Sequence, residues 1–290
     1  MKFFPRHGRT ATALAASVLI GAGVLTASLT SASANPPQHS STPLYVAAGP
    51  KPTVVLVHGA WADGSSWSGE IAQLQHLGYP VAVAPQPGRG PASDSEYLRD
   101  YLAAITGPIV LAGHSYGGFV ITDAATGNPN VKALVYIDAF APDQGESIGS
   151  LTAGSGSILE PALTNPASVL RLTGYPGAPA GAGDSYVLPQ TFATGFANDL
   201  PRNKAALLAA TQTPFATGGF SEPSTTPAWK TIPSWALISR QDKVIPPHSQ
   251  KLMSARAHAH VTEIDGSHLS LISQPDQVTR VIVKAATTTR

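Results

Sequence analysis

Short apolar runs recur along the chain and are separated by segments with a different periodicity. Most of these runs are rich in Val, Leu and Ala without alternating polar residues, a pattern typical of strands buried on both faces of a parallel sheet. The runs cover residues 53–57, 80–84, 109–112, 131–137, 234–239 and 260–264. They predict an α/β protein with a mostly parallel central sheet of about six strands.

Segments with helical periodicity lie between the apolar runs. Apolar residues recur at helical spacing from Trp67 to Leu77, and Gly78 ends the pattern. Capping-box sequences at residues 93–96 and 273–276 predict the starts of two further helices. Helices are also predicted over residues 116–126 and 246–256. Because strands and helices alternate at short intervals, right-handed crossovers should place helices on both faces of the sheet.

Residues 141–231 interrupt this alternation. They are dense in Gly, Pro, Ser and Thr, with helical patterns near residues 189–199 and 201–212. The segment is too long for a connecting loop and too poor in strand patterns to extend the sheet. We expect an inserted, largely helical lid over one end of the sheet, and no second sheet. The α/β core would then comprise residues 53–140 and 232–290.

The amino-terminal residues have the pattern of an export signal. Within residues 1–34, three basic residues precede an apolar stretch, and small residues before Asn35 suit a signal peptidase. A membrane anchor is the alternative, but Thr, Ser and Gly interrupt the apolar stretch. We expect cleavage after Ala34, a secreted mature chain without a membrane span, and a flexible lead-in over residues 35–52.

Composition narrows the classes of partner. The 290 residues are 43% hydrophobic and 12% charged, which suits one large core. The formal net charge of +1 becomes −2 without residues 1–34, which hold three basic residues and no acidic one. Such a chain has no electrostatic footprint for nucleic acid or anionic lipid. Because there is no cysteine, disulfides, thiolate nucleophiles and Cys metal sites are excluded. The oligomeric state stays open.

The strand over residues 109–112 runs into Gly-His-Ser-Tyr-Gly, with Ser115 at its centre. The Gly-x-Ser-x-Gly pattern predicts a nucleophile elbow, a sharp strand-to-helix turn that exposes one serine above the sheet edge. Gly113 and Gly117 would leave room for this turn. The pattern also arises by chance in a chain with 27 glycines, so the neighbouring loops must support the assignment.

A serine nucleophile needs a base and an acid at the same sheet edge, where the carboxyl ends of parallel strands meet. His268 lies on the loop after the last predicted strand, in the sequence Asp-Gly-Ser-His. His58 and His114 also lie at strand ends, and we interpret both as packing or hydrogen-bonding residues. His268 is therefore the predicted base.

Two aspartates follow strands and satisfy the Ser–Asp–His chain order of this type of fold. Asp242 follows the strand over residues 234–239, and Asp138 follows the strand over residues 131–137. We favour Asp242 because its strand should lie beside the one that leads to His268. The alternative for Asp242 is a surface carboxylate paired with Lys243, a contact of little weight.

A serine hydrolase also needs two backbone donors for the oxyanion of its tetrahedral intermediate. The N–H of Tyr116, directly after Ser115, is the first predicted donor. The second should come from the loop after the first strand, where His-Gly-Ala-Trp ends at residue 61. Ala60 is the predicted donor there, with Trp61 as the alternative.

These motifs together resemble the α/β-hydrolase superfamily, and within it the lid-bearing serine esterases similar to plant methyl esterases and hydroxynitrile lyases. The resemblance spans about residues 53–286 and rests on residues 55–61, residues 113–118, Asp242 and His268. It implies a triad of Ser115, Asp242 and His268 and acyl-enzyme chemistry. Hydroxynitrile lyases carry lysine after the catalytic histidine, and Leu269 at that position counts against cyanohydrin cleavage. Dehalogenases and epoxide hydrolases carry aspartate at the elbow, and Ser115 counts against both activities.

The sequence therefore predicts an esterase or lactonase acting on a small-molecule ester, with no metal or cofactor. A perhydrolase or peptidase using the same triad, and a ligand-binding protein with little turnover, remain alternatives. The substrate itself is not predicted, because specificity depends on the lid and loops. Four aromatic residues could line the pocket or fill the core, and we interpret each as core: Trp61, Phe192, Phe196 and Trp229.

Overall fold

The computed structural model describes residues 51–180 and 182–289. The predicted signal peptide and nearly all of the predicted lead-in lie outside these residues. All of the described residues belong to one compact unit. Among them, no helix is long and apolar enough to cross a membrane.

Six parallel strands form the central sheet, in the spatial order β2-β1-β3-β4-β8-β9. The strands are β1 (Thr53–Val57), β2 (Val81–Val83), β3 (Ile109–His114), β4 (Val131–Ile137), β8 (Ser234–Ser239) and β9 (His260–Ile264). The predicted α/β class and parallel sheet are confirmed. Strands β3 and β8 are buried along their whole length, whereas β9 exposes most of its residues because it forms an edge.

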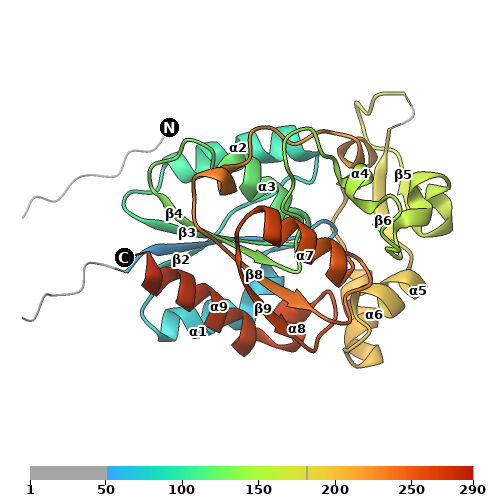
Figure 1. Ribbon diagram of the computed structural model, residues 1–290. Helices are drawn as coiled ribbons and strands as arrows, with labels where there is room; N and C mark the ends of the chain where they lie inside the picture. The colour runs from blue at the N-terminus through green and yellow to red at the C-terminus, as the bar shows by residue number, and fades with distance from the viewer. Residues whose placement is uncertain (1–50, 181, 290) are drawn as a thin grey trace, which may run out of the picture. The chain divides into compact units, whose positions relative to one another are not determined.

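Helices cover both faces of this sheet (Figure 1). The α-helices are α1 (Ser68–His76), α2 (Pro91–Ala103), α3 (Tyr116–Ala124), α4 (Ile148–Thr152), α5 (Pro189–Thr191), α6 (Arg202–Ala210), α7 (Pro247–Arg256), α8 (Ser270–Ser273) and α9 (Pro275–Thr288). Helices α1 and α9 pack together on one face, and α2 and α3 pack together on the other. Helices on both faces of the sheet agree with the crossovers expected from the sequence.

Both predicted capping boxes are wrong. Helix α2 begins at Pro91, before the predicted box, and Asp94 lies inside it, accepting a hydrogen bond from the Tyr116 hydroxyl. Helix α9 has Gln274 as its N-cap without a side-chain cap, and the Ser273 hydroxyl donates to Asp199 instead. In the second case a tertiary partner takes the serine hydroxyl that a local cap would have used.

The inserted segment, residues 141–231, contains a three-stranded antiparallel sheet besides its short helices. Its strands are β5 (Leu170–Thr173), β6 (Asp184–Val187) and β7 (Phe215–Ala216). The prediction of no second sheet is therefore wrong. These strands are too short to show a periodicity, and β7 pairs with a strand far away in the chain. The remaining helical pieces are 3₁₀ turns over residues 160–163, 166–168, 217–220 and 228–230 and a π turn, Phe192–Phe196.

The inserted segment lies at the end of the sheet where the strands point (Figure 1). Hydrogen bonds fasten it to the loop after β1, because the N–H of Thr213 donates to the carbonyl oxygen of Trp61 and the Trp61 indole donates to that of Ser185. The N–O distance is 3.1 Å for the bond from Thr213 and 2.9 Å for the bond from the Trp61 indole.

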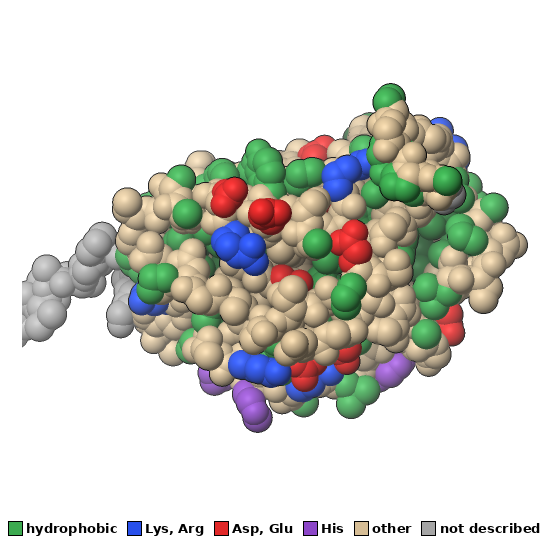
Figure 2. Space-filling view, turned by 90° about the horizontal axis from the view of Figure 1, so that it is seen from above, with side chains coloured by type: hydrophobic (Ala, Val, Ile, Leu, Met, Phe, Trp, Pro, Cys, Tyr) green, Lys and Arg blue, Asp and Glu red, His purple; other side chains and the backbone are tan. Residues whose placement is uncertain are grey.

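Figure 2 shows the molecule from above the view of Figure 1. On this face acidic and basic side chains are interspersed.

Glu70, on α1, is fully buried, and neither of its carboxylate oxygens has a hydrogen-bond partner in another described residue. Burial raises the pKa of its carboxyl to about 8 from an ordinary value of 4.5. Between these two values the folded protein keeps a proton that the unfolded chain releases, so this group makes stability fall as pH rises.

Glu70→Gln is expected to remove that loss of stability. The difference in free energy of unfolding between the variant and the parent should increase in favour of the variant by up to about 4 kcal/mol from pH 5 to pH 8. Each pKa unit corresponds to about 1.4 kcal/mol. Urea unfolding at both pH values measures the change. Glu96→Gln, at an exposed glutamate of α2, is the matched control. An equal offset at both pH values would contradict the prediction.

Candidate active site

Ser115 sits on the sharp turn between β3 and α3. Its φ of 53° and ψ of −123° lie in a region that residues other than glycine rarely adopt. A side chain at Gly113 would bring a Cβ within 2.5 Å of the carbonyl oxygen of Gly117. A side chain at Gly117 would come equally close to the carbonyl oxygen of Val57. The two glycines thus let α3 start directly against β3 and β1, which holds the serine in its strained conformation.

The structure brings Ser115, His268 and Asp242 into one hydrogen-bonded chain. His268 Nε2 lies 2.8 Å from Ser115 Oγ, and its Nδ1 lies 2.9 Å from Asp242 Oδ2. His268 is on the loop after β9, and Asp242 is on the loop after β8. All three side chains are buried. This arrangement suits proton transfer from the serine hydroxyl to the imidazole.

The Asp242 carboxylate is surrounded by donors. Its Oδ1 accepts the backbone N–H groups of Val244 and Ile245 at 2.8 Å and 3.0 Å. Its Oδ2 accepts the Gln250 side-chain amide at 2.8 Å as well as the His268 ring. Burial raises the pKa of Asp242, and these N–H groups oppose that rise by stabilising the carboxylate. Sequence reasoning missed Gln250, because its position on α7 carries no motif.

Asp138, the alternative acid, lies in a different hydrogen-bond network. It accepts the backbone N–H of Ser239 at 2.7 Å and the hydroxyl groups of Ser239 and Ser270. Burial, followed by the charge of Asp242, raises the pKa of the Asp138 carboxyl. The His268 ring is hydrogen-bonded to Asp242 and not to Asp138. Asp138 instead joins the end of β8 to the start of α8, two elements next to the site.

Further groups hold the loop of His268. The Nε2 of His114 lies 2.8 Å from the backbone carbonyl oxygen of His268. His114, one of the two other histidines at strand ends, is therefore a hydrogen-bonding residue. Asp199, in the inserted segment, accepts the N–H and hydroxyl of Ser267 and the hydroxyl of Ser273. No sequence signal pointed to Asp199, because the contact depends on how the inserted segment folds back.

The protonation of His268 follows from its surroundings. Burial lowers the pKa of its imidazole to about 3, so the ring is neutral at pH 7. A neutral ring beside the Asp242 carboxylate carries its proton on Nδ1, because that nitrogen must donate. Nε2 is then free to accept the Ser115 proton. Burial also lowers the pKa values of His58 and His114.

The predicted oxyanion donors lie beside the serine. Ala60 and Tyr116 line the same small space as Ser115. Tyr116 is the first residue of α3, where backbone N–H groups have no acceptor within the helix. A Cβ at Gly59 would lie 2.9 Å from Ser115 Cβ, so only glycine lets this loop approach so closely. Trp61, the alternative donor, has a φ of 60° and accepts the N–H of Thr213 through its carbonyl oxygen.

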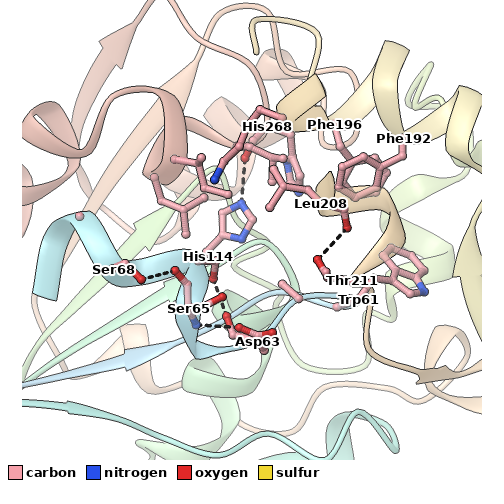
Figure 3. A pocket seen from close by; sticks show the side chains of 18 of the residues that line it. Trp61, Asp63, Ser65, Ser68, His114, Phe192, Phe196, Leu208, Thr211 and His268 are labelled. Atoms are coloured by element: carbon pink, nitrogen blue, oxygen red, sulfur yellow. Dashed lines mark hydrogen bonds between the residues drawn. The ribbon is translucent and has the colours of Figure 1, made fainter. Parts of the chain in front are cut away.

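A cavity of about 450 Å³ opens next to His268 (Figure 3). Its walls come from the loop after β1, from α8 and from the inserted segment. Three of the four aromatic residues interpreted as core line this cavity while also packing in the core, namely Trp61, Phe192 and Phe196. Trp229 lies elsewhere, and its indole donates to the carbonyl oxygen of Pro142. No group of His, Asp and Glu within residues 51–180 and 182–289 is arranged to hold a metal ion.

Comparison with known proteins identifies relatives of this chain. A family model described as "Alpha/beta hydrolase family" matches residues 54–281. A carbendazim hydrolyzing esterase from Nocardioides sp. is 36% identical over 110 residues, a match that covers 33% of this chain and 46% of that esterase. The probable hydrolase R7 of Phoma sp. is 26% identical and covers 81% of this chain and 98% of its own. The structure of polyneuridine aldehyde esterase matches the fold with a TM-score of 0.66 and 21% identity, over 81% of this chain and 98% of that one.

Proposed function

The chain belongs to the alpha/beta hydrolase family, and from this membership we propose that it cleaves a carboxylic ester or lactone through an acyl-enzyme on Ser115. The observation that carries the proposal is the continuous hydrogen-bond chain from Ser115 through His268 to Asp242. Relatives named as esterases and hydrolases support ester hydrolysis at the level of the family.

Acylation begins with the neutral imidazole of His268. Nε2 takes the proton of the Ser115 hydroxyl while Oγ attacks the carbonyl carbon of the ester. The carbonyl double bond opens, and its oxygen becomes the oxyanion of a tetrahedral intermediate. When the intermediate collapses, the bond to the alcohol oxygen breaks and Nε2 gives its proton to that oxygen. The products of this half-reaction are the free alcohol and the acyl group on Ser115.

Deacylation repeats the sequence with water. His268 takes a proton from the water, whose oxygen attacks the acyl carbonyl. The bond to Ser115 Oγ then breaks, and Nε2 returns the proton to Oγ. The net reaction consumes one ester and one water and yields one acid and one alcohol. For a lactone, the acid and the alcohol are the two ends of one molecule.

Two kinds of electrostatic stabilisation support these steps. The Asp242 carboxylate stabilises the imidazolium that forms twice in the cycle, and it keeps the ring in the tautomer that presents a bare Nε2. We assign stabilisation of the oxyanion to the backbone N–H groups of Ala60 and Tyr116. The positive end of the α3 dipole lies on the same side and adds to it.

Covalent labelling tests the proposal directly. A fluorophosphonate probe should modify the protein once per chain, because its phosphorus accepts an activated serine as the carbonyl carbon would. Peptide mass spectrometry should place the added mass on Ser115. Heat-denatured protein, in which the three side chains are separated, is the control and should not react. Absence of labelling, or labelling at another residue, would refute the assignment.

We also propose that the enzyme acts outside the cytoplasm on small-molecule esters. The support is the signal-like sequence of residues 1–34. We expect the 141–231 insertion to act as the lid that covers the site. Amino-terminal sequencing of the exported protein should begin at Asn35.

A further inference from the structure

Two separate spaces adjoin the Ser115–His268 pair. The larger is the 450 Å³ cavity, whose wall includes His268 but not Ser115. The smaller has a volume of only 20 Å³, and its wall includes Ser115 and Tyr116 but not His268. Ala60 and Trp61 line both spaces. The loop after β1 therefore divides them, and each space faces a different member of the reacting pair.

The chemistry of the proposed function assigns the two halves of an ester to these two spaces. His268 must protonate the leaving oxygen, so the alcohol half lies on the side of His268. The acyl carbon becomes bonded to Ser115, so the acyl chain lies on the side of Ser115. We propose that the substrate is an ester between a short apolar acid, of acetyl to propionyl size, and a larger, neutral polyol. This proposal rests on the proposed function.

The small space fits only a short acyl chain. Its volume is close to the minimum needed by a single water-sized group, which is also about the size of a methyl group. Its walls are mostly apolar, with Phe140, Ile148, Leu159, Phe215 and Val244 among them. An acetyl or propionyl group would fill it without leaving polar atoms unpaired, whereas a polar acyl group would lose its hydrogen bonds to water.

Leu163 and Phe220 form the outer limit of the acyl space. Both residues also line a separate groove of about 380 Å³ on the inserted segment. A longer acyl chain could reach that groove only by passing between these two side chains. Phe220 is held by ring contacts with Trp61 and Phe215, so Leu163, which is 39% exposed, is the side chain that can be shortened with least damage to packing.

The large cavity suits a bulkier and more polar group. Its volume lies in the range of pockets that hold whole small molecules, and methanol would leave most of it empty. Asp63, Ser65 and Ser68 face it on one side, and Phe192 and Phe196 on the other (Figure 3). Among its lining residues Lys204 carries a positive charge and Asp63 a negative charge, while His114 and His268 are neutral at pH 7. The two charges are opposite in sign. The Ser66 and Ser68 hydroxyl groups donate to backbone carbonyl oxygens, so their lone pairs are left to accept from hydroxyl groups of a ligand, which favours a neutral polyol over an ionic alcohol.

Two ester series measured on the intact protein test the proposal. With p-nitrophenol as the alcohol, kcat/KM should fall at least about tenfold from propionate to octanoate, because a single methylene that does not fit an apolar pocket costs about tenfold or more. With acetate as the acid, acetylated glucose should exceed methyl acetate by about tenfold in kcat/KM. Octanoate hydrolysed as fast as acetate would overturn the acyl assignment. Methyl acetate hydrolysed as well as acetylated glucose would overturn the alcohol assignment.

Variants of Leu163 test the acyl limit itself. Leu163→Ala should raise the ratio of octanoate to acetate activity by about tenfold, and Leu163→Trp should lower the ratio of butyrate to acetate activity. Leu172→Ala, at an exposed leucine of β5 that lines none of the three spaces, is the matched control and should leave both ratios unchanged. Unchanged ratios in both Leu163 variants would overturn the proposal.

Failure of this inference can be told apart from failure of the proposed function. If the protein hydrolyses esters and the probe labels Ser115, but long acyl chains are preferred, only the assignment of the two spaces is wrong. If no ester in either series is hydrolysed and the probe labels nothing, the proposed function fails and the inference fails with it.

Discussion

Ser115→Ala is expected to abolish ester hydrolysis, with kcat falling by about 10⁶-fold, the loss typical of removing the nucleophile of a serine triad. The physical reason is that alanine has no oxygen to attack the carbonyl or to carry the acyl group. Removing one hydroxyl should leave the fold intact, because alanine keeps the Cβ of serine and places the same demand on the backbone at a φ of 53°. Turnover of p-nitrophenyl acetate, measured with enough enzyme to detect the background rate, gives the ratio.

The same variant should lose fluorophosphonate labelling completely. Ser93→Ala is the matched control, because Ser93 is an exposed serine on α2, away from the hydrogen-bond chain. It should keep both parental turnover and parental labelling. A Ser115→Ala protein that still hydrolyses the ester within tenfold of the parent would mean that the catalytic nucleophile lies elsewhere.

Asp242→Asn is expected to lower kcat by about 10⁴-fold. An asparagine amide at this position would donate a hydrogen bond to His268 Nδ1. The ring proton would then move to Nε2, and Nε2 could no longer accept the proton of Ser115. The side chain keeps its size, and its carbonyl oxygen can still accept the N–H groups of Val244 and Ile245. Steady-state kinetics at pH 7 measures the effect.

Asp138→Asn is the comparison variant that shows which of the two aspartates is the acid of the triad. Its amide oxygen can accept the N–H of Ser239, and its amide nitrogen can donate to the Ser239 and Ser270 hydroxyl groups, which also act as acceptors. We expect this variant to lose no more than about tenfold in kcat, since it alters a network beside the site and not the ring of His268. If Asp138→Asn lost more activity than Asp242→Asn, the assignment of the acid would be reversed. Thermal unfolding of both variants checks that each is folded.

The strands and the strand-end chemistry were predictable because local patterns encode them. Buried parallel strands require uninterrupted apolar side chains, and a nucleophile elbow requires glycine on both sides of its serine, as Gly113 and Gly117 show. His268 could be selected because few histidines lie on a loop after a strand. The topology rules of parallel sheets then placed these loops at a common edge.

The helix starts and the second sheet were less predictable. Ser93 and Ser273 begin sequences that match a capping box, yet tertiary contacts use the neighbouring polar groups differently. Strands β5, β6 and β7 are short, and their pairing depends on partners distant in the chain. Local propensity is weak for such elements, because packing against the rest of the protein supplies most of their stability.

The sequence by itself determined the α/β class, the order of the strands in the chain, and the residue types at the sheet edge. It favoured Asp242 over Asp138 only through the expected neighbourhood of their strands, because both residues follow strands in the required order. The tertiary structure shows which carboxylate is hydrogen-bonded to His268, since hydrogen bonding depends on distances of a few tenths of an ångström that chain order does not contain. Likewise, Asp199, Gln250 and the two spaces beside Ser115 and His268 exist only where distant segments meet, so no local pattern in the sequence could have predicted them.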